Sequence, residues 1–228
     1  MVRLHLTVEG PTEQKFVLRV LQSHLATLGV DVPKPRCVAL CEKKGRVHRG
    51  GMARYEPFKK DLCRWLKQYG SDEVFFSTMV DLYRLPRDFP AYEEASRAHD
   101  PYWKVRRLEN AFEEDIGDRR FIAYIQLHEF ETLLFADPAI FGAYFPECGR
   151  QIANLVQIQI EVGNPELIDD GEQSAPSKRI GKEIPEYLGV KPLAGPLIAQ
   201  KIGLEIIRAK CRHFHEWVTK LEQLGAKS

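Results

Sequence analysis

Four acidic side chains follow predicted strands at points where a parallel sheet would bring them together. Glu9 follows an alternating apolar stretch, Asp81 follows an uninterrupted apolar run, and Glu129 and Glu131 follow a third apolar stretch. The carboxyl ends of parallel strands meet at one edge of a sheet. Carboxylates held close together repel each other unless a cation lies among them, and oxygen ligands suit Mg²⁺ or Mn²⁺. The pattern therefore predicts a divalent metal site suited to phosphoryl-transfer chemistry.

Each acid also has a simpler interpretation. Glu9 and Asp81 could instead form structural ion pairs with arginines. Glu13 is predicted in the first turn of a helix, where it either supports the acidic site or only complements the helix dipole. Glu129 and Glu131 share a face if the strand continues through them, whereas His128 and Glu131 share one if a helix has begun. A zinc-protease motif is excluded, because Thr132 stands where its second histidine would be.

A second group of interest is the sequence Pro-Ser-Lys-Arg at residues 176–179. Ser177 is suited to cap a helix, which places Lys178 and Arg179 in its first turn. Two cations there oppose the helix dipole. This placement favours an anionic neighbour, either a substrate phosphate or the acidic cluster, although a solvated basic turn has the same sequence pattern.

A glycine-flanked basic loop could grip a nucleic-acid backbone. No G-x-x-x-x-G-K-[ST] sequence occurs in the chain, so it does not bind ATP through a Walker A loop. The predicted nucleic-acid contacts are Lys43, Lys44, Arg46 and Arg49.

The elements that must position these residues alternate between strand and helix. Apolar alternation or runs predict strands at residues 2–8, 36–40, 74–80 and 121–127, and helical periodicity predicts a helix between each pair. This order predicts a parallel sheet in a Rossmann-like, three-layer α/β sandwich over residues 1–135. Beyond it, frequent prolines and two helices near residues 197–207 and 208–224 predict a helical extension, 136–228, packed on the sandwich.

The composition narrows the class of protein. The chain has 228 residues and a formal net charge of +1, which argues against a protein that coats DNA without sequence preference. It shows no membrane-spanning apolar run and no signal-peptide pattern, so we expect no membrane association. Five scattered cysteines without a paired C-x-x-C motif predict reduced thiols and a cytoplasmic location.

Several of these motifs together resemble an uncharacterised bacterial family of Toprim-like proteins. The matching segments are Val-Glu-Gly with Thr-Glu at residues 8–13, Asp-Leu-Tyr at 81–83, His-Glu-Phe-Glu at 128–131, Ala-Pro-Ser-Lys-Arg at 175–179, and Cys-x-His-Phe at 211–214 with Trp217. The resemblance implies the Toprim fold of topoisomerases, bacterial primases and overcoming-lysogenization-defect nucleases. By position, Glu9 matches the first-strand glutamate of Toprim domains, and Asp81 matches the first aspartate of their Asp-x-Asp motif. Tyr83 stands in place of the second aspartate.

The resemblance implies a Mg²⁺- or Mn²⁺-dependent nuclease that works with an ABC- or SMC-like ATPase in anti-phage defence. Glu9 and Asp81 would hold metal, Glu129 and Glu131 would complete the site, Glu13 would support it, and Lys178 or Arg179 would steady phosphate charge. DNA and RNA are both open as substrates, including RNA cleavage by a toxin, and a homo-oligomer is possible. The alternative is a catalytically inert adaptor that docks the ATPase, which Tyr83 favours and the retained acids disfavour.

Overall fold

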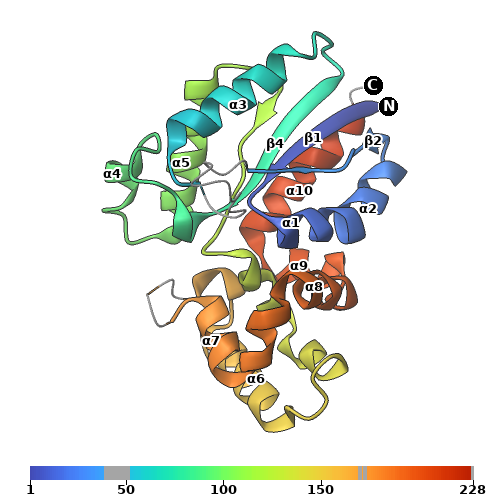
Figure 1. The fold of residues 1–228 in the computed structure, drawn as a ribbon, viewed down its shortest axis with the longest axis vertical. Helices are drawn as coiled ribbons and strands as arrows, with labels where there is room; N and C mark the ends of the chain where they lie inside the picture. Colours follow the sequence, from blue (N-terminus) through green and yellow to red (C-terminus); the bar gives the residue numbers. More distant parts are fainter. Residues whose placement is uncertain (39–51, 169–170, 172–173, 227–228) are drawn as a thin grey trace, which may run out of the picture.

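The computed structural model describes residues 1–38, 52–168, 171 and 174–226, and its centre is a six-stranded sheet with parallel pairing throughout (Figure 1). The strand order is β2–β1–β4–β5, with β3 also pairing with β1 and β6 with β4. The long strands β1 and β4 pair from Arg3 opposite Val74 to Val8 opposite Met79, and β4 continues two residues further to Asp81. The strands are β1 (Val2–Val8), β2 (Val30–Asp31), β3 (Arg36–Cys37), β4 (Val74–Asp81), β5 (Phe121–Ile122) and β6 (Ile125–Gln126).

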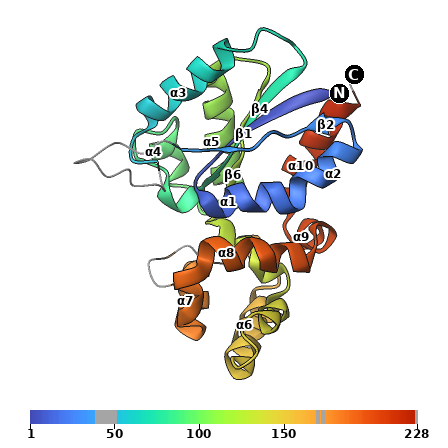
Figure 2. The ribbon, with the colours of Figure 1, turned by 45° about the vertical axis from the view of Figure 1, so that its right-hand side comes forward.

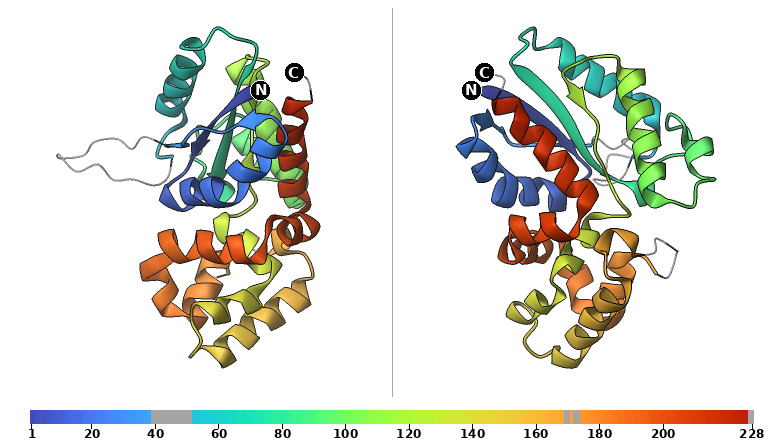
Figure 3. Two further views of the ribbon diagram at one scale, coloured as in Figure 1. Left: turned by 90° about the vertical axis from the view of Figure 1, so that its right-hand side faces the viewer. Right: turned by 180° about the vertical axis from the view of Figure 1, so that it is seen from behind.

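Helices cover both faces of this sheet, which confirms the predicted α/β sandwich (Figure 3). On one face, α1, η1, α2 and α10 bury apolar side chains such as Phe16 and Phe214 against β1. On the other, α3 and α5 bury Phe58 and Phe112 against β4 and β5. The bounds are α1 (Pro11–Phe16), the π-helical turn η1 (Val17–Leu21), α2 (Gln22–Thr27), α3 (Tyr55–Lys67), α5 (Pro101–Ile116) and α10 (Arg212–Gly225).

The last helix, α10, lies directly on the sheet. The Trp217 indole N–H donates to Ser77 Oγ of β4 at 3.0 Å, and its ring stacks on Tyr124 with 4.1 Å between ring centroids. At its end, Gly225 passes so close to the Leu28 carbonyl that a β-carbon at residue 225 would lie 1.8 Å from that oxygen. The predicted helical extension therefore includes one helix that completes the sandwich.

The rest of the extension forms a helical layer beyond the carboxyl edge of the sheet (Figures 1 and 2). Helix α8 runs beneath α1 and packs against it. It spans Pro185–Ile202 without a break, although Pro192 and Pro196 lie inside it. The predicted helix at 197–207 is therefore wrong in its bounds: it joins the end of α8 to most of α9. The layer begins before residue 136, because it includes η3 (Phe130–Ala136). Its other members are η4 (Pro138–Ala143), α6 (Gly149–Val162), η5 (Pro165–Leu167), α7 (Pro176–Glu183), α8 and α9 (Leu204–Lys210).

The predicted strand at 121–127 is interrupted. Tyr124 lies between β5 and β6, and its backbone N–H and carbonyl both bond the Thr78 hydroxyl at 3.0 Å instead of a strand backbone. Two short helices, η2 (Leu82–Arg84) and α4 (Tyr92–Ala95), follow β4. None of the described helices is both long enough and apolar enough to span a membrane.

Candidate metal centre

Five carboxyl groups gather at the carboxyl edge of the sheet, and we call them the acidic cluster. Two of them lie at the ends of β1 and β4, one lies in the first turn of α1, and the other two lie at the start of η3. Every member is at least nine-tenths buried. For Glu9, Glu13, Asp81 and Glu131, the charge of at least one other member raises the pKa of the carboxyl group. The members are Glu9, Glu13, Asp81, Glu129 and Glu131.

Glu9 and Asp81 form the centre of the cluster. The backbone N–H of Asp81 donates to Glu9 Oε2 at 2.8 Å, which ties the ends of β1 and β4 together. Burial raises the pKa of Glu9, against the effect of that N–H bond. Burial and the charges of Glu9 and Glu13 raise the pKa of Asp81 well above its usual range. Asp81 Oδ1 is buried with no hydrogen-bond partner, so the site holds an unsatisfied carboxylate oxygen.

Glu13 lies in the first turn of α1, as predicted, and its carboxylate turns back toward the preceding loop. Its Oε2 accepts the Gly10 backbone N–H at 2.8 Å, in the manner of a capping box. Burial and the nearby charge of Glu9 raise the pKa of Glu13 to about 7. Glu13 therefore both caps the helix and belongs to the cluster, which joins the two interpretations that the sequence left open.

A sharp turn directs Glu129 into the cluster. His128 adopts a left-handed backbone conformation with φ of 59°, and its Nε2 lies 2.9 Å from the Glu166 carbonyl oxygen. The chain then begins η3 at Phe130, so the strand does not continue through Glu129. Glu129 Oε1 accepts the backbone N–H of Ser177 in the first turn of α7, where the positive end of the helix dipole favours a carboxylate.

This contact explains the Ala-Pro-Ser-Lys-Arg motif structurally. The motif begins α7 with Ala175 at its N-cap, so the prediction that Ser177 caps the helix is wrong; instead the Ser177 backbone N–H donates to Glu129 of the acidic cluster. Lys178 is exposed, and the Arg179 Nε–H donates to the Ser174 carbonyl at 2.6 Å. Lys178 and Arg179, the two residues predicted to steady phosphate charge, therefore lie within α7, and no described contact joins them to a cluster carboxylate.

Glu131 is fully buried and contacts α8 instead of the strand ends. Tyr187 OH donates to Glu131 Oε1 at 2.8 Å, and Lys191 Nζ lies 2.8 Å from Glu131 Oε2. Burial raises the pKa of Glu131, and the Lys191 ammonium opposes that shift. Burial lowers the pKa of Lys191, but the charges of Glu131 and Asp81 outweigh it and raise that pKa above its usual value.

The donor chemistry of the cluster fits a divalent cation. Glu9 and Asp81 lie together, and Asp81 offers an unsatisfied oxygen at a site where negative charge is already unfavourable. Within the described part of the chain, no three acidic, histidine or cysteine side chains converge closely enough to ligate one metal ion. Mg²⁺ commonly takes only one or two carboxylates and keeps several waters, so the Glu9–Asp81 pair suits it. Glu129 and Glu131 already have partners on α7 and α8.

The remaining predicted residues lie elsewhere. Tyr83 is 39 % exposed, and its backbone N–H donates to the His128 carbonyl at 2.9 Å. The predicted nucleic-acid contacts Lys43, Lys44, Arg46 and Arg49 lie outside the described residues. Sequence reasoning missed Tyr187 and Lys191, because the prolines around them argued against the helix that carries them.

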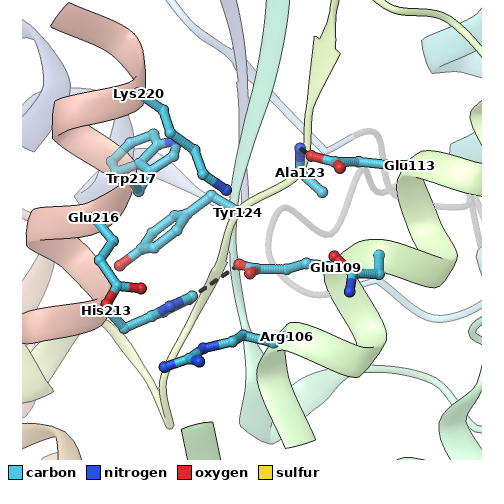
Figure 4. Close-up of a pocket in the computed structure, with 10 residues that line it drawn as sticks. Arg106, Glu109, Glu113, Ala123, Tyr124, His213, Glu216, Trp217 and Lys220 are labelled. Carbon is cyan, nitrogen blue, oxygen red and sulfur yellow. Dashed lines mark hydrogen bonds and ion pairs between the residues drawn. The ribbon is translucent and has the colours of Figure 1, made fainter. Parts of the chain in front are cut away.

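Away from the acidic cluster, a polar pocket with a volume of about 130 Å³ lies between α5 and α10 (Figure 4). Glu109 Oε1 accepts the Ile125 N–H at 2.8 Å and contacts His213 Nε2 at 3.0 Å. Glu113 Oε1 accepts the Ala123 N–H at 2.9 Å. Burial lowers the pKa of His213, but the Glu109 carboxylate outweighs it and the pKa is raised. Glu109 and Glu113 therefore accept hydrogen bonds from backbone N–H groups of the segment that follows the edge strand β5. This role is structural.

A protein-family model described as a domain of unknown function, DUF4276, matches residues 8–222. The match spans all five members of the acidic cluster together with α8. No curated protein and no solved structure matches the chain.

Proposed function

Because the chain belongs to the DUF4276 family, whose function is unknown, we propose its activity from the site itself: metal-dependent hydrolysis of nucleic-acid phosphodiesters. The observation that carries the proposal is the buried, unpartnered Oδ1 of Asp81 among four other carboxyl groups. The other four acids have hydrogen-bond partners in the fold, but Asp81 Oδ1 has none, and each buried charge raises the free energy of the others. A bound cation would remove that penalty.

The proposed mechanism assigns a task to each described residue. Glu9 and Asp81 would hold Mg²⁺ or Mn²⁺, which when bound polarises a phosphodiester and stabilises the leaving oxygen. Glu13, whose pKa is about 7, can take up a proton at neutral pH. Glu129 holds the start of α7 against the site, and Lys178 and Arg179, which lie in the first turn of that helix, would be the residues that steady phosphate charge. Lys191 supplies a fixed positive charge within the cluster.

The test is cleavage by the purified full chain. Supercoiled DNA and total RNA are each incubated with Mg²⁺, with Mn²⁺ and with EDTA, using the wild type and Glu9→Gln. We expect cleavage of one substrate that requires the metal and is lost in Glu9→Gln. Cleavage that persists in EDTA, or that survives in Glu9→Gln, would contradict the proposal.

The alternative function is an inert adaptor, and Tyr83 is the observation that favours it. The residue that would be a second aspartate in a Toprim site is a partly exposed tyrosine that bonds through its backbone. An adaptor would keep the fold and bind no metal. Absence of both cleavage and Mn²⁺ binding would therefore favour the adaptor over the nuclease.

We also propose an ABC- or SMC-like ATPase partner in anti-phage defence, for which the support is the Toprim-like resemblance of the sequence. Leu188 and Leu193 on α8 are large apolar side chains that are 53 % and 54 % exposed, a feature typical of interaction surfaces. Co-purification with an ATPase encoded beside this chain tests the proposal. Retention that is unchanged in Leu193→Glu would place the contact elsewhere on the molecule.

A further inference from the structure

The acidic cluster already contains a cation supplied by the protein. Lys191 Nζ lies 2.8 Å from Glu131 Oε2, a carboxylate that is fully buried. The Lys191 charge also acts on Glu9, Glu13 and Asp81, lowering the pKa of each against the effect of burial. One ammonium group therefore offsets charge across most of the cluster.

The ammonium is held in place by the helix that carries it. Tyr187, one helical turn before Lys191, donates to the other oxygen of Glu131. Further along α8, Gly195 allows close approach to α1 and η3, since a β-carbon there would lie 3.0 Å from the Phe130 ring and 3.5 Å from Thr12 Cγ2. Tyr187 and Lys191 thus contact the two oxygens of the Glu131 carboxylate, one each. The position of α8 therefore determines where the Lys191 ammonium lies.

Three of the cluster's carboxylates differ in the partners that they have. Glu131 is engaged by Lys191 and Tyr187, whereas Glu9 and the unpartnered Asp81 lie together. The sequence offers no second acid close behind Asp81, because Leu82 and Tyr83 follow it and the next acid is Asp88. Of these three carboxylates, Glu9 and Asp81 are the two left available to a metal ion.

We propose that Lys191 takes the place of a second metal ion, so that the site binds a single divalent cation at Glu9 and Asp81. This inference rests on the proposed function, because it assumes that the cluster is a metal centre. It deepens that function by fixing the number of metal ions and by assigning Lys191 as a positioning charge. The affinity of the site for metal then depends on the net charge of the Lys191–Glu131 pair.

The experiment is a calorimetric titration of the metal-free full chain with MnCl₂. Four proteins are compared: the wild type, Lys191→Met, Glu131→Gln and the double variant. We expect the wild type to bind a single Mn²⁺ per chain. Lys191→Met adds one net negative charge and should bind Mn²⁺ about tenfold more tightly or take up a second ion, and Glu131→Gln should bind about tenfold more weakly. The double variant restores the net charge and should bind like the wild type.

The possible outcomes distinguish a failure of the role proposed for Lys191 from a failure of the proposed metal-dependent function. Binding of two Mn²⁺ ions by the wild type, or equal affinity in all four proteins, would contradict the proposal that Lys191 replaces a second metal ion. Either result would still support a metal centre at the acidic cluster. No Mn²⁺ binding by the folded wild type would overturn both. If Lys191→Met does not fold, Glu131→Gln and the double variant still decide, because their predicted affinities differ.

Discussion

The Asp81 backbone N–H donates to Glu9 Oε2 at 2.8 Å, whereas the Asp81 side chain leaves its own buried Oδ1 without a partner. The same residue thus fixes the direction of one carboxylate and presents another that folding does not satisfy. The register explains why they meet, because β1 and β4 run in parallel with Val8, the residue before Glu9, opposite Met79, two residues before Asp81. The repulsion among these buried carboxylates should lower the free energy of unfolding of the metal-free protein, and a bound metal ion should restore it.

Replacing Asp81 by asparagine should therefore stabilise the metal-free protein. Asp81→Asn removes one buried charge from the repelling group, and we expect the free energy of unfolding in EDTA at pH 8 to rise by about 1 kcal/mol. Mn²⁺ should raise the melting temperature of the wild type but not of Asp81→Asn. Urea unfolding and thermal scans measure both effects. Asp72→Asn, at an exposed ion pair with Arg119, is the control and should change little. A less stable Asp81→Asn in EDTA would mean that the aspartate is a structural residue.

Glu13 predicts how stability depends on pH. Its pKa is about 7 in the folded chain against an ordinary 4.5, so the folded state keeps a proton that the unfolded state loses. Its stabilising contribution is therefore complete below pH 4.5 and is lost as pH rises through about 7. In EDTA, melting temperatures across this range should fall less steeply for Glu13→Gln than for the wild type. The exposed Glu186→Gln serves as the control, and a slope unchanged in Glu13→Gln would refute the assignment.

Substitution of Gly195 tests whether the close packing of α8 positions Tyr187 and Lys191 at the site. A side chain at residue 195 would press on Phe130 and the Tyr187 hydroxyl, both 3.0 Å from its β-carbon. Gly195→Val should cost about 1–3 kcal/mol of stability and weaken Mn²⁺ binding by shifting Tyr187 and Lys191. Gly189→Ala is the matched control in the same helix, because its β-carbon meets nothing within 4 Å and alanine favours helix. Chemical denaturation and calorimetry decide, and equal stability of the two variants would count against close packing here.

Glu109 should be a structural residue with no part in the activity. It accepts the Ile125 N–H and contacts His213, so Glu109→Ala leaves buried polar groups without a partner. We expect a loss of about 3–5 kcal/mol in stability, with metal affinity retained by the folded fraction. Glu216→Ala, which removes a half-exposed partner of Arg212, should cost less than about 1 kcal/mol. A small effect of Glu109→Ala on unfolding would show that water replaces its bonds.

The sequence was sufficient to predict the fold class and the strand ends that form the cluster. The alternation before Glu9 and the apolar run before Asp81 place both acids correctly at one edge, because parallel strands leave few other arrangements. The break at Tyr124 escaped prediction, since Thr78 replaces strand backbone as the hydrogen-bond partner there. The pattern of apolar residues does not indicate where a side chain takes over the hydrogen bonds of a neighbouring strand.

Lys191 and Tyr187 were missed for a different reason. Proline lacks a backbone N–H and clashes with the preceding turn, so Pro192 and Pro196 argued against a helix across residues 185–202. Tertiary packing outweighs that preference, because Tyr187, Ala194 and Ile198 are buried along the helix. A burial pattern of this kind depends on α1 and η3, which contact α8 only in the folded chain.

The most direct test of the metal-dependent nuclease is the rate of Mn²⁺-dependent cleavage by Asp81→Asn beside Asp72→Asn. Both variants make the same chemical change, one at the unpartnered buried acid and one at an exposed acid. We predict wild-type cleavage by Asp72→Asn and a loss of at least about a hundredfold in Asp81→Asn, a loss of about 2.7 kcal/mol in transition-state stabilisation. Equal rates for the two variants would contradict the assignment of the acidic cluster as the active site.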